Sequence, residues 1–203
     1  MIYLASSSPR RRELLRQIGI RFETLLMRSS PDRGGDVDET PIPGEDAEDY
    51  VKRVAAAKAV SGWRRIVERR IPLHPVLAAD TAVILDGKIL GKPESTDAAI
   101  AMLESLSGRE HEVLTAVSCA YQETVETEFS RSKVRFCELS EKDIRDYIAT
   151  GEPMDKAGGY GIQGRAALFI ERMDGSYSGV MGLPLFETGR LLNRMGQSWP
   201  MKF

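Results

Sequence analysis

The chain has 203 residues, of which 42% are hydrophobic and 29% charged, and its formal net charge is −2. This length predicts one domain, and the apolar content is enough to bury a core. The slight negative charge argues against a nucleic-acid-binding protein, which would carry a basic excess. No apolar run approaches the roughly 18 residues of a membrane span. The basic residues follow the short apolar start instead of preceding it, unlike a secretory signal.

In the first third of the chain, apolar spacing predicts strands over 2–5 and 21–27 and helices over 9–18 and 46–61. Ser8 can cap the first helix, and Pro9 is allowed in its first turn. Prolines, glycines and acids make residues 28–45 a predicted mobile loop. The basic stretch 62–75 is predicted to be an irregular insert.

The rest of the chain is predicted to mix strands and helices. Residues 75–93 indicate a strand, a break after Asp80, a second strand, a turn at Asp86–Gly87 and a third strand. Further strands are predicted over 111–121, 125–137 and 166–173, and further helices over 95–107, 140–151 and 184–195. Because the elements follow no regular βαβ rhythm, we expect an α/β fold with an elongated mixed sheet.

Cys119 and Cys137 are the only cysteines, and both lie in apolar stretches. We expect two buried reduced thiols, which is typical of a cytoplasmic protein.

The stretch "LASSSPRRRELL" (4–15) concentrates hydroxyl and cationic side chains where a strand passes into a helix. A helix N-terminus presents free backbone N–H groups that favour an anion. Cations there oppose the helix dipole, and guanidinium groups suit phosphate. The turn therefore predicts a phosphate site, unless the arginines simply solvate the helix start. The side chains concerned are Ser6, Ser7, Ser8, Arg10, Arg11 and Arg12.

Asp80 ends the apolar run "LAAD", where a carboxylate is costly unless it has a partner or a function. It is either a turn residue or a metal ligand or general base. On composition alone, Asp38 and Glu39 are solvated charges of the acidic loop. Lys58 and Lys92, taken singly, are ordinary surface lysines.

Several other chemistries are excluded by their motifs. The segment 159–164, "GYGIQG", lacks the preceding strand and following helix of a dinucleotide site. His74 and His111 have no partner at zinc-ligand spacing, and no G-x-S-x-G motif indicates a serine hydrolase. The remaining hydrolytic chemistry combines a carboxylate, a metal ion and water.

Six segments together resemble the Maf family of nucleoside triphosphate pyrophosphatases. Residues 28–36, residues 62–75 and the tail after residue 195 match that family poorly. The matching segments are 4–15, 37–39, 50–59, 78–93, 106–117 and 152–185.

The resemblance implies hydrolysis of a nucleoside triphosphate between its α- and β-phosphates, with Mg²⁺ or Mn²⁺ as cofactor. It implies a fold like that of the inosine triphosphatases, in which one domain (here 1–203) forms two lobes around a deep cleft. It also suggests a homodimer. Matched residue by residue, it implies a catalytic Asp80, phosphate binding by Ser6, Ser8, Arg10, Arg11, Lys58 and Lys92, and metal binding by Asp80 with Asp38 or Glu39.

The segment "KAGGYGIQG" (156–164) resembles the dTTP/UTP subgroup of the family, whereas another subgroup carries "CAGSFxxEG" and prefers 7-methyl-GTP. Gln163 therefore replaces a glutamate. A carboxylate suits the N–H groups of guanine, whereas an amide both donates to and accepts from uracil or thymine. The resemblance places base selection at Arg10, Thr81 and Gln163.

Two alternatives remain at this stage. One is a binding protein without turnover, because the family is linked to septum inhibition in dividing cells. The other is an RNA-binding protein that uses the arginines of 10–12 and 64–70, which the net charge disfavours. Removal of unwanted nucleotides is the expected cellular role of a pyrophosphatase.

Overall fold

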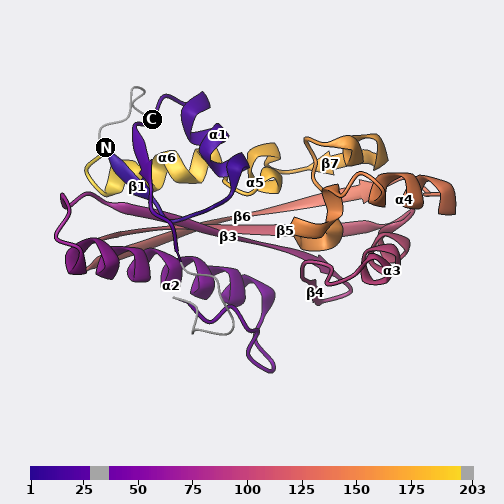
Figure 1. Cartoon of the computed structure of the whole chain (residues 1–203), viewed down its shortest axis with the longest axis horizontal. Helices are drawn as coiled ribbons and strands as arrows, with labels where there is room; N and C mark the ends of the chain where they lie inside the picture. Colours follow the sequence, from indigo (N-terminus) through magenta and orange to yellow (C-terminus); the bar gives the residue numbers. More distant parts are fainter. Residues whose placement is uncertain (28–36, 198–203) are drawn as a thin grey trace.

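The computed structural model describes residues 1–27 and 37–197 (Figure 1). In this described part, three 3-10 helices lie between the regular elements: η2 Glu152–Asp155, η3 Ala157–Gly159 and η4 Arg165–Phe169. The regular elements are β1 Ile2–Leu4, α1 Pro9–Gln17, β2 Phe22–Thr24, α2 Ala47–Glu68, β3 Val76–Leu85, β4 Lys88–Leu90, α3 Thr96–Leu106, β5 Glu110–Tyr121, β6 Thr124–Phe136, α4 Glu141–Ile148, β7 Ile170–Asp174, α5 Tyr177–Met181 and α6 Leu185–Arg194.

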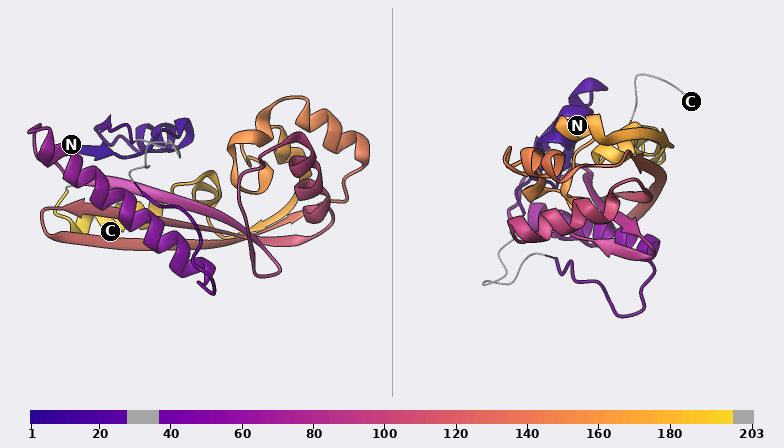
Figure 2. Two further views of the ribbon diagram at one scale, coloured as in Figure 1. Left: turned by 60° about the horizontal axis from the view of Figure 1, so that its bottom comes forward. Right: turned by 90° about the vertical axis from the view of Figure 1, so that its right-hand side faces the viewer.

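One seven-stranded sheet organises the chain, in the order β2-β1-β3-β5-β6-β7, with β4 also paired to β3. β1 runs parallel to β2 and β3, and the other pairs are antiparallel. The expectation of an elongated mixed sheet with flanking helices is confirmed. The helices gather in two groups at the two ends of the long strands (Figure 2). A deep cleft between two lobes stays a prediction, as does the single-domain boundary.

Side chains of β3 alternate between the two faces of the sheet. Ala82 lies in an apolar cluster with residues of α2, whereas Ala79 lies in one with residues of α1 and α6. By the same alternation, Asp80 faces α2 and Thr81 faces α1. The two neighbouring polar residues therefore serve opposite faces of the sheet.

The edge of β3 is interrupted at its middle. β5 pairs with one edge of β3 from Val76 to Ile84. On the other edge β1 reaches only Leu77, and β4 pairs only from Val83 onward. Residues 78–82 thus have no described strand beside them there, and the gap lies at the carboxyl end of β1. Ligands of open α/β sheets bind at such changes of strand order.

The extents of two predicted strands were wrong. β3 is continuous through Asp80, with no break, because β5 pairs with it from Val76 to Ile84. Near the C-terminus, η4 occupies the start of the predicted strand 166–173, and β7 covers only Ile170–Asp174. The short helix α5 was missed. Of the predicted loop 28–45, residues 37–45 contain no helix or strand, and 28–36 lie outside the described residues.

The helix α2 is longer than predicted and includes the first half of the supposed basic insert. Gly62 allows this helix to lie against β3, since an added Cβ would come within 2.7 Å of the Val76 side chain. The buried Arg65 donates a hydrogen bond to the Leu26 carbonyl. No helix among the described residues has the length and apolar character to cross a membrane.

Both cysteines are free thiols, as predicted. Cys119 is buried in β5, and burial raises its pKa to about 12. Cys137 is only half-buried, so the prediction of burial was wrong for that residue.

His111 is the buried polar centre of the aromatic cluster at the α3–α4 end of the sheet. Its Nε2 lies 2.7 Å from the Tyr160 hydroxyl, and its ring packs edge-on against Phe136. Burial lowers the pKa of His111 to about 4. The folded protein therefore resists protonation of a ring that the unfolded chain protonates near its ordinary pKa.

We expect His111 to make folding stability depend on pH below its ordinary pKa of 6.5. As the pH falls from 6.5 to about 4, the unfolded chain binds a proton at this histidine and the folded protein does not. The free energy of unfolding therefore falls by about 1.4 kcal/mol for each unit of decreasing pH in that window. Thermal unfolding of His111→Gln should show a shallower decline than wild type. His74→Gln provides the control, and equal slopes for His111→Gln and wild type would contradict this account.

Candidate active site

Arg11 joins the N-terminal turn to the C-terminal third of the chain. Its Nε donates to the Gly182 carbonyl at 2.7 Å. Its two terminal nitrogens donate to Ser6 Oγ and Thr81 Oγ1, both at 3.3 Å. Ser6 also accepts the backbone N–H of Ser8 at 3.2 Å. The predicted phosphate turn is thus organised around one inward-pointing guanidinium.

The charge of Arg11 has no directly paired carboxylate among residues 1–27 and 37–197, because all three hydrogen-bond acceptors are neutral. Burial lowers the Arg11 pKa, and the nearby negative charge of Asp80 partly opposes that shift. Arg11 is half-buried, and a partly desolvated cation held only by neutral oxygens gains from a bound anion.

Thr81 continues this network across β3 and β5. Its hydroxyl oxygen lies 3.0 Å from the Thr115 hydroxyl oxygen, directly across the strand pair. Thr115, which is fully buried, also donates to the Gly179 carbonyl at 2.7 Å. Because that carbonyl only accepts, the Thr115 proton goes to it, and the Thr81 hydroxyl donates to Thr115.

A second cluster lies on the α2 face of β3. Lys58 Nζ lies 2.8 Å from Asp80 Oδ1 and 2.8 Å from Glu39 Oε2. The side chains of Lys58 and Asp80 are 16% and 9% exposed, and that of Glu39 is 52% exposed. Tyr50 donates to the Glu39 carbonyl at 3.1 Å. Burial and then the charges of Asp80 and Glu39 raise the Tyr50 pKa to about 12.

Asp38 does not join this cluster. Its carboxylate accepts the Thr40 backbone N–H at 2.9 Å, and hydrogen bonds from the Thr40 side chain and backbone lower its pKa. Of the two acids proposed from the sequence, the structure therefore brings only Glu39 toward Asp80.

The carboxylate oxygens near Lys58 fit a divalent cation that is bound jointly by the protein and the phosphates of a substrate. No three His, Cys, Asp or Glu side chains in the described part of the chain group closely enough to hold a metal alone. Mg²⁺ is usually bound by one or two carboxylates plus substrate phosphates. Asp80 and Glu39, gathered around the Lys58 ammonium, supply such a pair.

The side chains of the remaining predicted residues lie around these clusters. Ser8 is the N-cap of α1, but its side chain makes no capping hydrogen bond. Arg10 is half-buried. Burial raises the pKa of Asp155, but the hydrogen bond and charge of Lys156, followed by the charge of Arg10, lower it overall. Lys92 and Gln163 are exposed. A hydrogen bond of 3.0 Å from Gly158 to the Gly91 carbonyl links their two segments.

Sequence reasoning missed Thr115, Tyr50 and the Gly182 carbonyl. Thr115 lay in "HEVLTAV" with no sign of its partner, because its contact with Thr81 follows from the β3–β5 register. Tyr50 resembled a helix-face residue. A carbonyl acceptor leaves no signal in a sequence.

The fold and these clusters define an α/β protein with a candidate anion site at a gap in its sheet. The chain belongs to the family described as "Maf-like protein", whose model matches residues 1–195. A protein of Nitrosomonas europaea named dTTP/UTP pyrophosphatase is 56% identical over 97% of this chain and 95% of its own length. One of Aromatoleum aromaticum with the same name is 58% identical, over 96% and 95%. Among solved structures, the Staphylococcus aureus Ham1 protein gives a TM-score of 0.44 at 16% identity, covering 66% of this chain and 71% of that one.

Proposed function

We propose that this protein hydrolyses nucleoside triphosphates, with dTTP and UTP preferred, to the nucleoside monophosphate and pyrophosphate. The observation that carries the proposal is the pairing of two clusters across β3. One offers a half-buried arginine without a paired carboxylate, and the other offers a carboxylate beside a lysine. The names of the two relatives support the same reaction.

In this proposal Asp80 deprotonates or orients the water that attacks the α-phosphorus. It is held on a rigid central strand, and Lys58 fixes one of its oxygens. A carboxylate with a defined orientation is what general base catalysis requires. The bond between the α-phosphorus and the bridging oxygen breaks, and pyrophosphate leaves with that oxygen.

The N-terminal turn holds the phosphates. Ser6 and Arg11 are oriented by their mutual hydrogen bond, and Ser8 and Arg10 follow on the same turn. Lys58 and Lys92 add positive charge. Neutralising the charge that develops in phosphoryl transfer is the main task of such a site.

Asp80 and Glu39 are the residues that would hold a Mg²⁺ or Mn²⁺ ion. Its chemistry there would be to offset the negative charge of the phosphates. Asp38 is left out of this set, because its carboxylate is engaged with Thr40.

The reaction is tested by measuring pyrophosphate release with Mg²⁺ from dTTP, UTP, CTP, GTP and 7-methyl-GTP. We expect dTTP and UTP to react fastest. Absence of release from every nucleotide would overturn the proposal.

Base selection is assigned to Gln163, with Arg10 and Thr81. Gln163→Glu replaces an amide that donates and accepts with a carboxylate that only accepts. We expect kcat/KM for UTP to fall about ten-fold relative to GTP, with less effect on phosphate binding, which pyrophosphate inhibition would measure. An unchanged UTP-to-GTP ratio would refute this assignment. Gln122→Glu, at the exposed β5–β6 turn, is the matched control.

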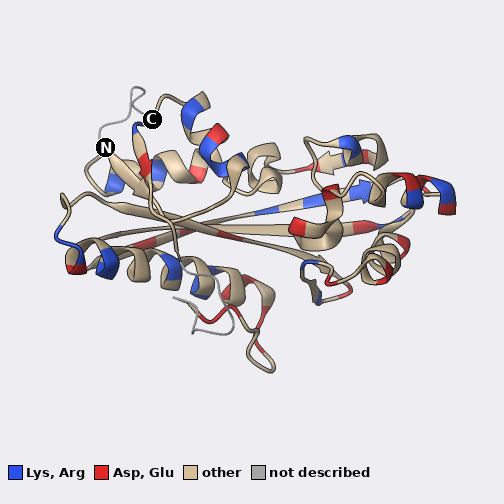
Figure 3. Cartoon of the chain, viewed as in Figure 1, with Lys and Arg blue, Asp and Glu red and all other residues tan. Residues whose placement is uncertain are grey.

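The cellular setting follows from this function. We place the protein in the cytoplasm, where it would remove unwanted nucleotides, and the homodimer stays a prediction. The two relatives are both named pyrophosphatases, which gives the alternative of a septum-inhibiting binding protein no support. Acidic residues are interspersed with basic ones along several elements, such as α2 and α4 (Figure 3), in keeping with a substrate other than nucleic acid.

A further inference from the structure

Gln163 sits on a short turn with little packing of its own. The turn closes with a hydrogen bond of 3.0 Å from Gly164 N to the Gly161 carbonyl. Ile162 is buried at 7% exposure and anchors the turn on its N-terminal side. Gln163 itself is exposed. Another contact must therefore fix the C-terminal side of the turn if the amide is to keep one position.

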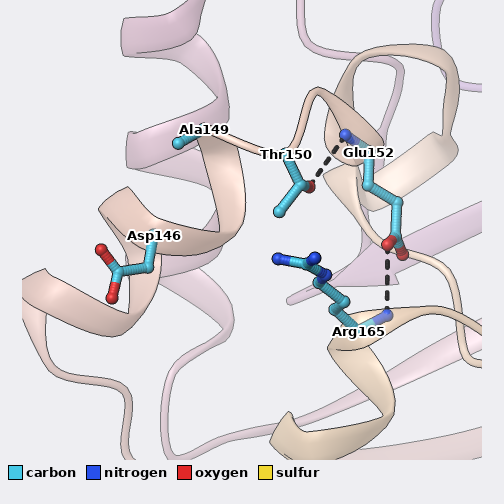
Figure 4. A pocket seen from close by; sticks show the side chains of 5 residues that line it. All are labelled: Asp146, Ala149, Thr150, Glu152 and Arg165. Carbon is cyan, nitrogen blue, oxygen red and sulfur yellow. Dashed lines mark hydrogen bonds between the residues drawn. The ribbon is translucent and has the colours of Figure 1, made fainter.

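Glu152 supplies that contact (Figure 4). Its Oε2 accepts the Arg165 backbone N–H at 3.1 Å. Its Oε1 accepts the Tyr147 hydroxyl at 3.1 Å, and its own backbone N–H donates to Thr150 Oγ1 at 3.1 Å. The carboxylate thus joins the end of α4 to the residue two positions after Gln163.

The turn is shaped to admit this carboxylate. A Cβ added to Gly164 would lie 1.9 Å from Glu152 Oε1. The φ of Gly164 is −98°, so its backbone does not itself require glycine. The missing side chain serves the close approach of Glu152. Lys156 supports the same residue, because its Nζ donates to the Glu152 carbonyl at 2.6 Å.

The contact between Glu152 and Arg165 lies beside a cavity. Glu152 and Arg165 line a cavity of about 600 Å³, together with Asp146, Ala149 and Thr150. The hydrogen bonds of Glu152 and the buried Ala166 therefore hold the C-terminal side of the turn together, and only Glu152 ties it to α4 through a side-chain carboxylate. A residue that moves by about 1 Å in a site of this kind can cost up to a hundred-fold in rate.

We propose that Glu152 is a positioning residue for base selection, because its carboxylate fixes the turn that presents Gln163. This inference rests on the proposed function. Glu152 touches no reacting atom, so its loss changes the choice between bases and spares the chemistry at Asp80.

The test compares Glu152→Ala, Glu152→Gln and Gly164→Ala with wild type. We expect Glu152→Ala to lower the UTP-to-GTP ratio of kcat/KM about ten-fold, with less change in kcat for GTP. Glu152→Gln keeps an acceptor for Arg165 N–H and should restore most of the ratio. Gly164→Ala should lower the ratio because its Cβ displaces the carboxylate. Asp146→Ala, which lines the same cavity and pairs with Lys142, is the control.

Gly164→Ala adds little once Glu152 is alanine, because the clash is then gone. The double variant should therefore show the ratio of Glu152→Ala alone. Thermal unfolding of each variant shows whether it is folded. If Glu152→Ala does not fold, the UTP-to-GTP ratio of Gly164→Ala tests the role of Glu152 instead. An unchanged ratio in folded Glu152→Ala or Gly164→Ala, or an equal fall in Asp146→Ala, would overturn the inference.

Affinities for UTP and GTP are measured beside turnover. A wild-type protein that binds UTP but does not hydrolyse it would refute the proposed function, and the ratio of affinities would still decide the role of Glu152. Equal wild-type affinity for the two nucleotides would overturn the inference as well.

Discussion

Asp80→Asn should abolish most pyrophosphate release while leaving the protein folded. Asparagine keeps the shape of the side chain and an oxygen that accepts from Lys58. It removes the negative charge and the basic site that proton transfer needs. We expect kcat for UTP to fall about a thousand-fold, as is typical when a general base is lost.

Asp86→Asn is the matched control for this variant. Asp86 follows β3 directly, but its side chain is 65% exposed and pairs with Arg109. Its substitution should leave kcat unchanged. If Asp80→Asn retained wild-type turnover in a folded protein, Asp80 would have no role in proton transfer.

Lys58→Met should give the second largest loss. The ammonium holds the Asp80 and Glu39 carboxylates on either side of it. Without it, the two negative charges repel each other and Asp80 loses its fixed orientation. We expect kcat/KM for UTP to fall about a hundred-fold, comparable to removing one preorganised charge-stabilising donor.

Lys52→Met tests whether the loss of any α2 lysine has the same effect. Lys52 lies on the same helix, pairs with Glu48 and is 37% exposed. Raising the Mg²⁺ concentration should recover part of the activity of Lys58→Met, because a cation then replaces the missing charge between the carboxylates. Equal activities of Lys58→Met and Lys52→Met would contradict a role for Lys58.

Much of the fold could be predicted from the sequence, because its long hairpin and capped helices carry strong local signals. The β5–β6 pair followed from alternating residues. Ser140 and Asp143 form the capping box at the N-terminus of α4. The end of α2 could not be predicted. Its basic residues make the apolar face that packs on β3 hard to recognise in the sequence. Gly62 is typical of a helix end, but here it allows a close contact between helix and strand.

The site was predictable in its members but not in their partners. The resemblance indicated Asp80, Lys58 and Arg11 by motif. Which side chains meet depends on sheet register and on segments more than a hundred residues apart, such as the Gly182 carbonyl that orients Arg11. The choice of Glu39 over Asp38 required the local turn at Thr40, which captures the Asp38 carboxylate.

Hydrolysis of UTP in water enriched with ¹⁸O tests the central claim most directly. If water attacks the α-phosphorus, the label appears in the nucleoside monophosphate, and the pyrophosphate carries none. Label in pyrophosphate, or release of orthophosphate with a nucleoside diphosphate, would contradict the proposed reaction at Asp80.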